Sequence, residues 1–83
     1  MNSTVDTLFF IKSHFPGLEE SIEASYFQSF SFRALCEDYR DCSAAREYWR
    51  QQALEGTHNH ELEYAVLLAK LDREIRHWPG NQP

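Results

Sequence analysis

Two stripes of mostly apolar residues constrain the fold of this chain most strongly, because the residues of each stripe recur at alternating spacings of three and four. The first consists of Phe32, Leu35, Tyr39, Cys42, Arg46, Trp49 and Ala53, and the second of Tyr64, Leu68, Leu71, Ile75 and Trp78. Such spacing predicts two amphipathic helices that each bury one face. Gly56, Thr57 and Asn59 lie between the stripes and favour a short connection. We therefore predict an all-α fold built on a long antiparallel helical hairpin.

The residues before the hairpin predict one or two short helices packed on it. Ser3 and Asp6 resemble a helix start, and Pro16 with Gly17 imposes a turn. The segment 18–27 reads as a second amphipathic helix, and Ser29 or Ser31 can cap the long helix that starts near Phe32. Pro79 and Gly80 stop the last helix. We expect a single helical domain at residues 1–78 and a flexible tail at 79–83.

Chain length and charge narrow the possible partners. A chain of 83 residues supports a single small core, which typically supplies only about 3–5 kcal/mol, so self-association is a natural source of further stability. Thirteen acidic and eight basic residues give a formal net charge of −5. This charge repels nucleic-acid backbones and anionic lipid. We expect neither nucleic acid nor a membrane as a partner.

The location that we expect is the cytoplasm. The longest apolar stretch, residues 8–11, is far shorter than the roughly 20 residues of a membrane-spanning helix. The first residues also lack the basic segment and apolar core of a secretory signal.

Two groups of residues resemble parts of metal sites, but neither is complete. Glu74 and His77 form an E-x-x-H pair, which di-iron bundles use in duplicate. His58, His60 and Glu61 form a second cluster, without the Cys-x-x-Cys pairs of zinc sites. We predict no metal and no cofactor, although a symmetric oligomer could supply a second E-x-x-H copy.

The two cysteines give no support to a catalytic function. Cys36 and Cys42 are six residues apart on one helix, about 120° from each other, so they cannot form a disulfide within it. We expect two reduced thiols that pack as small apolar groups, and a redox role stays open. No nucleophile–base motif and no phosphate-binding glycine pattern is present, so we expect a protein that is not an enzyme.

The phenylalanines are the candidates for an interface. Six of them lie within the first 32 residues, more than short helices can easily cover. A purely internal core remains one explanation, and an exposed patch that meets a second subunit or another protein is the other. Phe9 and Phe10 cannot both face the same side of one helix. The candidate interface residues are Phe9, Phe10, Phe15, Phe27 and Phe30.

Arg46 is the one charged residue of the first stripe. An arginine there must lay its stem along apolar neighbours and send its guanidinium to an acid or to water. We predict that Arg46 sets the register of the two helices.

One further pattern spans both predicted helices of the hairpin. The motif F-x-x-L-x-x-x-Y at 32–39, followed by the returning helix with Glu63, Leu67, Leu71 and Ile75, resembles the small bacterial helical-hairpin proteins of the YdcH-like kind over residues 32–76. This resemblance implies a bacterial cytosolic hairpin and no catalytic residues.

Together these patterns predict a non-enzymatic interaction or assembly module, acting as a homodimer or with another protein. Two alternatives remain open: a small metal- or thiol-dependent helical protein, and an accessory subunit of a larger enzyme.

Overall fold

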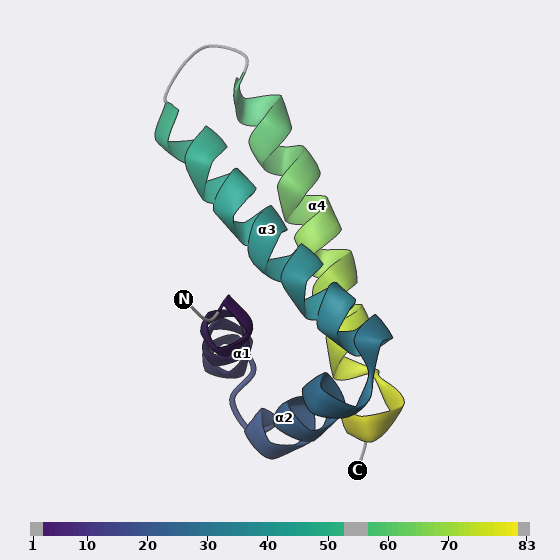
Figure 1. Cartoon of the computed structure of the whole chain (residues 1–83). Helices are drawn as coiled ribbons and strands as arrows, with labels where there is room; N and C mark the ends of the chain where they lie inside the picture. Colours follow the sequence, from purple (N-terminus) through teal and green to yellow (C-terminus); the bar gives the residue numbers. More distant parts are fainter. Residues whose placement is uncertain (1–2, 53–56, 82–83) are drawn as a thin grey trace.

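The computed structural model describes residues 3–52 and 57–81, and within these ranges the protein is all-helical. Figure 1 shows the four α-helices, α1 (Ser3–His14), α2 (Glu19–Gln28), α3 (Phe30–Gln52) and α4 (Thr57–Arg76). A short 3-10 helix, η1 (Pro79–Asn81), follows α4. The predicted fold class is confirmed: α3 and α4 form a long antiparallel hairpin, and α1 and α2 pack on its base.

The helix boundaries follow from local chemistry. Gly17 has φ +93°, a left-handed conformation that side-chain-bearing residues rarely adopt, and it provides the turn between α1 and α2. The Ser29 hydroxyl accepts a hydrogen bond from the Phe32 amide at 3.2 Å, so α3 begins at Phe30 with Ser29 as its cap. α4 begins at Thr57, which places 58 and 59 inside the helix rather than in a loop. Ala53 and Gly56 lie outside the described residues.

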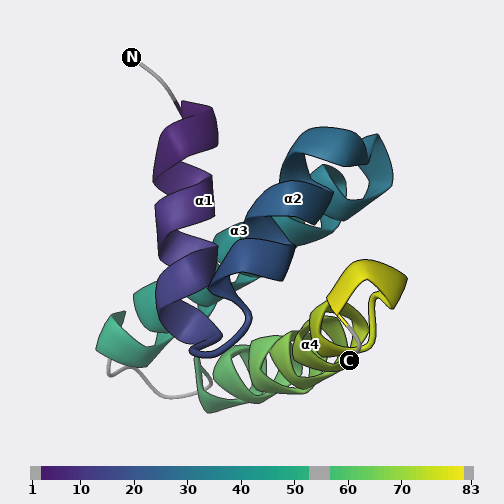
Figure 2. The same ribbon diagram turned by 90° about the horizontal axis from the view of Figure 1, so that it is seen from below.

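The two short helices pack at the base of the hairpin. In the view from below, α1 and α2 lie across this base, and the segment after α4 lies beside α2 (Figure 2). Arg40 Nη1 donates to Thr7 Oγ1 at 2.8 Å and joins α3 to α1. The guanidinium of Arg33 donates to the Tyr26 carbonyl at 3.3 and 3.4 Å and joins α3 to α2. Among the described residues, no element covers the face of α4 that carries Leu62 and Val66.

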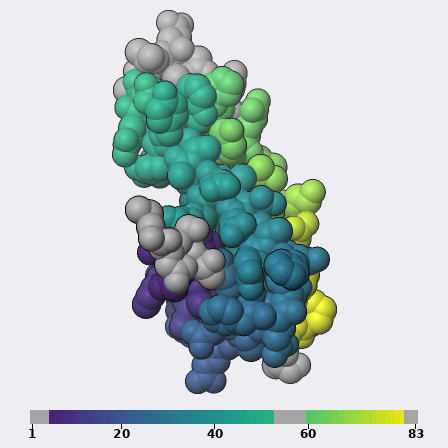
Figure 3. All heavy atoms as spheres, in the orientation of Figure 1, coloured from purple at the N-terminus to yellow at the C-terminus, as the bar shows by residue number. Residues whose placement is uncertain are grey.

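The core occupies only the base of the hairpin. Its fully buried side chains include Phe15, Ile22, Tyr26, Phe32 and Ile75. Beyond Tyr39 on α3 and before Leu71 on α4, no described side chain is fully buried. The distal part of the hairpin, residues 43–52 and 57–67, projects beyond this base, and we call it the arm (Figure 3).

Two pairs of side chains link the helices within the arm. Trp49 stacks on His60 with ring centroids 4.5 Å apart. Arg46 Nη2 lies 3.9 Å from Glu61 Oε1. Trp49 is half-buried rather than fully enclosed by the seam. These contacts hold the arm together without forming a dry core.

The segment after α4 differs from its expected role as a flexible tail. The structure instead forms η1 from Pro79–Asn81 and packs it against α2. Trp78 anchors the segment, since its ring lies 5.1 Å from that of Phe32. Gly80 is so close to α2 that a Cβ atom there would lie 2.6 Å from Ser25 Oγ. The domain thus extends at least to residue 81.

Candidate functional site

The candidate interface phenylalanines divide into exposed and buried residues. Phe9, Phe27 and Phe30 are 69%, 60% and 84% exposed. Phe10 is half-buried and packs against the core, with its ring 4.2 Å from that of His14. Phe9 and Phe10 therefore face different sides of α1, as expected from their adjacency.

Phe15 is the exception among these candidates, because it is completely buried. Its ring lies 5.4 Å from that of Tyr39, and the Arg76 guanidinium carbon lies 4.8 Å from its centroid. The turn at Pro16–Gly17 directs the chain from α1 into α2 and encloses Phe15 between the helices. Phe15 is thus a core residue, and the sequence-based assignment to an interface is corrected.

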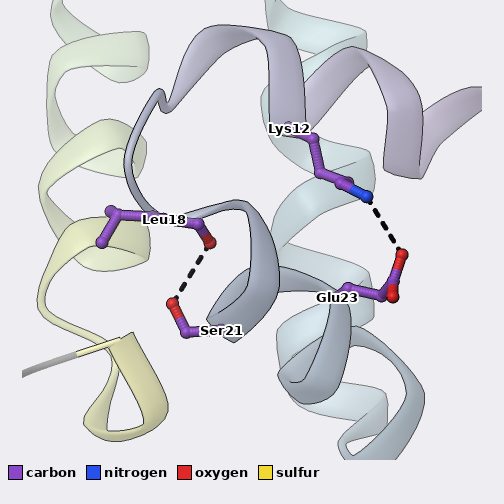
Figure 4. A network of polar contacts seen from close by, with 4 residues as sticks. All are labelled: Lys12, Leu18, Ser21 and Glu23. Carbon is purple, nitrogen blue, oxygen red and sulfur yellow. Dashed lines mark hydrogen bonds and ion pairs between the residues drawn. The ribbon is translucent and has the colours of Figure 1, made fainter.

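A small apolar crevice lies between α1 and α2. It has a volume of about 170 Å³ and is lined by Val5, Leu8, Phe9, Lys12, Glu23 and Phe27. The Lys12 ammonium lies 3.0 Å from Glu23 Oε1, so the two charges at the crevice neutralise each other (Figure 4). We call this surface the phenylalanine crevice. It brings Phe9 and Phe27 together, as a contact surface would require.

A larger open groove lies between the lower halves of α3 and α4. Its volume is about 500 Å³, and its lining includes Leu35, Asp38, Leu71, Glu74 and Trp78. His77 lies at the same groove. Because Asp38, Glu74 and His77 are all exposed to solvent, the groove does not provide the buried, shaped environment in which such groups usually catalyse.

The two groups of residues that resemble parts of metal sites lie near opposite ends of α4, with His60 and Glu61 in its first turns and Glu74 in its last. Among the described residues, no three histidine, cysteine, aspartate or glutamate side chains are arranged to hold a metal ion. His60 Nδ1 lies 4.0 Å from Glu63 Oε2, one turn along the same helix. The side chain of His58 lies outside the described atoms.

Both cysteines are free thiols. Burial, with a smaller contribution from neighbouring Glu37, raises the pKa of Cys36 to about 12. Burial, with the nearby charges of Asp38 and Asp41, also raises the pKa of Cys42. Since the thiolate is the reactive form, these shifts oppose nucleophilic chemistry near neutral pH.

The raised pKa of Cys36 predicts a loss of stability in alkali. The unfolded thiol releases its proton near pH 9, whereas the folded thiol keeps it until about pH 12. The stabilisation that the folded state gains from the raised pKa of Cys36 is fully present below pH 9, and it is lost as the pH rises from 9 to about 12. At pH 10 we expect this effect to lower the free energy of unfolding by about 1.4 kcal/mol relative to pH 7.

Urea unfolding of wild type and Cys36→Ala at pH 7 and 10 measures this effect. The stability difference between the two proteins should shrink by that amount at pH 10. Tyr39, whose pKa is raised mainly by burial and also by Asp72, affects both proteins alike, as does Cys42. An unchanged difference would show that Cys36 titrates normally in the fold.

Arg46 lies where the stripe placed it, on the α4 side of α3. It lines a groove with Tyr39, Ala65 and Leu68, and its Nε is buried without a hydrogen-bond partner in the described structure. Its contact with Glu61 is long at 3.9 Å. The predicted role in setting helix register stays a prediction.

Exposed apolar side chains on the arm were not among the sequence candidates. Tyr48, Leu62 and Val66 are 57%, 50% and 72% exposed. The signal was present in the sequence, because Leu62, Val66 and Ala69 repeat at helical spacing outside the second stripe.

Comparison of the chain with protein-family models, with curated proteins and with solved structures gave no match. The similarity to YdcH-like hairpins therefore stays a prediction. Among the described residues, no helix has the length and apolar character needed to cross a membrane.

Proposed function

We propose that this chain is a non-enzymatic interaction module that associates with a second copy of itself. The observation that carries the proposal is the amount of large apolar side chain left uncovered by a single copy. Large apolar residues with substantial exposure are Val5, Phe9, Phe27, Phe30, Tyr48, Leu62, Val66 and Leu67. Single exposed apolar residues are ordinary, but concentrations of them usually mark contacts.

The distribution of these residues supports assembly over catalysis. They lie at both ends of an elongated molecule with extents of 43 × 31 × 21 Å, at the phenylalanine crevice and Phe30 near the base, and along the arm. The titratable groups of the large groove are exposed, and both thiols are held protonated near neutral pH. The described surface thus offers more for packing than for chemistry.

The arm gives a physical reason for association. The described side chains of the arm include none that is fully buried, so the arm gains little from the hydrophobic effect, which favours removal of apolar surface from water. A partner that covers the arm would add the missing burial. A small domain with a limited core benefits most from such an addition.

The mass of the particle in solution tests this proposal. Light scattering coupled to size-exclusion chromatography, run over a dilution series, should give about twice the chain mass of 9.8 kDa at high concentration and the monomer mass on dilution. A particle that keeps the monomer mass up to about 1 mM would contradict self-association, because even weak specific dimers are populated there.

A further inference from the structure

The first half of α4 is apolar on two opposite sides. Tyr64, Leu68 and Leu71 face α3, whereas Leu62 and Val66 lie on roughly the opposite side of the helix, given about 100° per residue. Ala69 belongs to the second set and lies at its edge, beside the groove that Tyr39 and Arg46 line. We call the second set the outer stripe. Leu62 and Val66 are 50% and 72% exposed, and Ala69 is exposed as well. A helix with apolar residues on both sides is typical of one that is covered on both.

Nothing in the described part of the chain covers the outer stripe. α1 and α2 pack at the base of the hairpin, where Phe15 meets Arg76 and α2 meets η1, whereas the outer stripe lies farther along α4. In Figure 3 the green atoms of α4 lie along one edge of the molecule. This side is accessible to a second molecule.

The charges beside the outer stripe fit a second copy of the same helix. Glu63 and Lys70 each follow a stripe residue directly and are seven residues apart, so they lie on the same flank. The Glu63 side chain is 73% exposed, and Lys70 is exposed without an ion pair in the described structure. Two identical helices packed antiparallel, with their twofold axis between these residues, place Glu63 of each copy opposite Lys70 of the other.

The same arrangement aligns the apolar residues. Antiparallel helices that pair Glu63 with Lys70 also bring Val66 of one copy beside Ala69 of the other, a large residue against a small one. Leu62 then meets Arg73, whose aliphatic stem can lie along it while the guanidinium reaches water. A parallel pair would instead place Glu63 and Lys70 of the two copies on opposite flanks of the contact, where they form no pairs with each other.

The other exposed surfaces are less suited to self-pairing. The charges at the phenylalanine crevice, Lys12 and Glu23, already neutralise each other within one copy. The large groove presents Asp38 and Glu74, which would repel the same residues of a second copy.

We infer that the protein dimerises by antiparallel packing of α4 against α4, through the outer stripe and two Glu63–Lys70 pairs. This inference rests on the proposed self-association and names its surface. The contact spans about three helical turns from Leu62 to Arg73, so it falls at the small end of specific interfaces and gives a reversible dimer.

A charge at the centre of the stripe tests the surface. Val66→Glu puts two carboxylates in the contact and should raise the dimer dissociation constant at least roughly 100-fold, measured by light scattering or sedimentation equilibrium. Val66 is mostly exposed in one copy, so the variant should keep its helicity by circular dichroism. Phe27→Glu, at a residue of similar exposure in the phenylalanine crevice, is the matched control and should still dimerise.

Exchange of the flanking charges tests the orientation. Glu63→Lys and Lys70→Glu alone each create two like-charge contacts and should weaken the dimer about tenfold. An equimolar mixture of the two variants should dimerise with nearly wild-type affinity, because every contact in the mixed dimer again joins opposite charges. The double variant E63K/K70E should do the same by itself.

The outcomes separate this inference from the function on which it rests. A dimeric Val66→Glu protein together with a monomeric Phe27→Glu protein would overturn the α4 interface and leave self-association in place. A mixture that associates no better than its components would overturn the antiparallel arrangement. A wild-type protein that stays monomeric at all concentrations would overturn both proposals.

Discussion

Replacing Phe15 by alanine is expected to lower the free energy of unfolding by about 3–5 kcal/mol, which is the usual cost of removing a buried phenylalanine. Phe15 is 0% exposed and contacts the Tyr39 ring and the Arg76 guanidinium. The substitution would leave a cavity where α1, α3 and α4 meet. A loss of that size approaches the whole stability of a core this small, so much of the variant should be unfolded at 25 °C.

Phe9→Ala is the matched control for this prediction. Phe9 lies on the same helix but is 69% exposed, so its removal should change stability by no more than about 0.5 kcal/mol. Urea denaturation followed by circular dichroism measures both variants. Equal losses for the two proteins would mean that Phe15 is not enclosed as described.

Gly80→Ala is expected to cost about 0.5–1.5 kcal/mol, the cost of turning a buried side chain away from its preferred rotamer, because the overlapping atom is the end of the Ser25 side chain. A Cβ atom at position 80 would lie 2.6 Å from Ser25 Oγ, and Ser25 is only 7% exposed. To relieve the overlap, either the serine side chain must move or η1 must leave α2. Thermal denaturation of wild type and Gly80→Ala measures the effect.

The double variant Gly80→Ala with Ser25→Ala isolates the cause. Alanine at position 25 removes the overlapping oxygen and leaves the Ser25 Cβ at 3.9 Å, which is ordinary contact. We expect the double variant to be more stable than Gly80→Ala alone. If Ser25→Ala brings no recovery, the overlap is not what limits position 80.

Much of the fold could be predicted from the sequence because helical periodicity is a local property. The two stripes identified α3 and α4, and Pro16 with Gly17 marked the turn between α1 and α2. The start of α3 was predicted two residues late. Ser29 was one of two possible caps, and only its position relative to the Phe32 amide distinguishes it from Ser31.

Features that depend on tertiary contacts were harder to predict. Phe15 follows the last residue of α1, and its burial depends on where α3 and α4 pass, which spacing along the chain does not reveal. The packing of η1 against α2 depends on the missing side chain of Gly80 meeting Ser25, a relation between residues 55 positions apart. The residues of the outer stripe of α4 also recur at helical spacing, but the stripe on the opposite face has more and larger apolar residues and alone was used to predict the packing of the helix.

All the fully buried side chains described in the hairpin lie at its base, and this divides the described protein into two regions of different local stability. Backbone amides at the base of α3 and α4 can open to solvent only when the whole domain unfolds, because the core must be dismantled first. Amides in the arm can open by separation of two helix ends alone, at a smaller free-energy cost. The same sequence therefore combines a base of high local stability with an arm whose local stability rises when a second copy binds it.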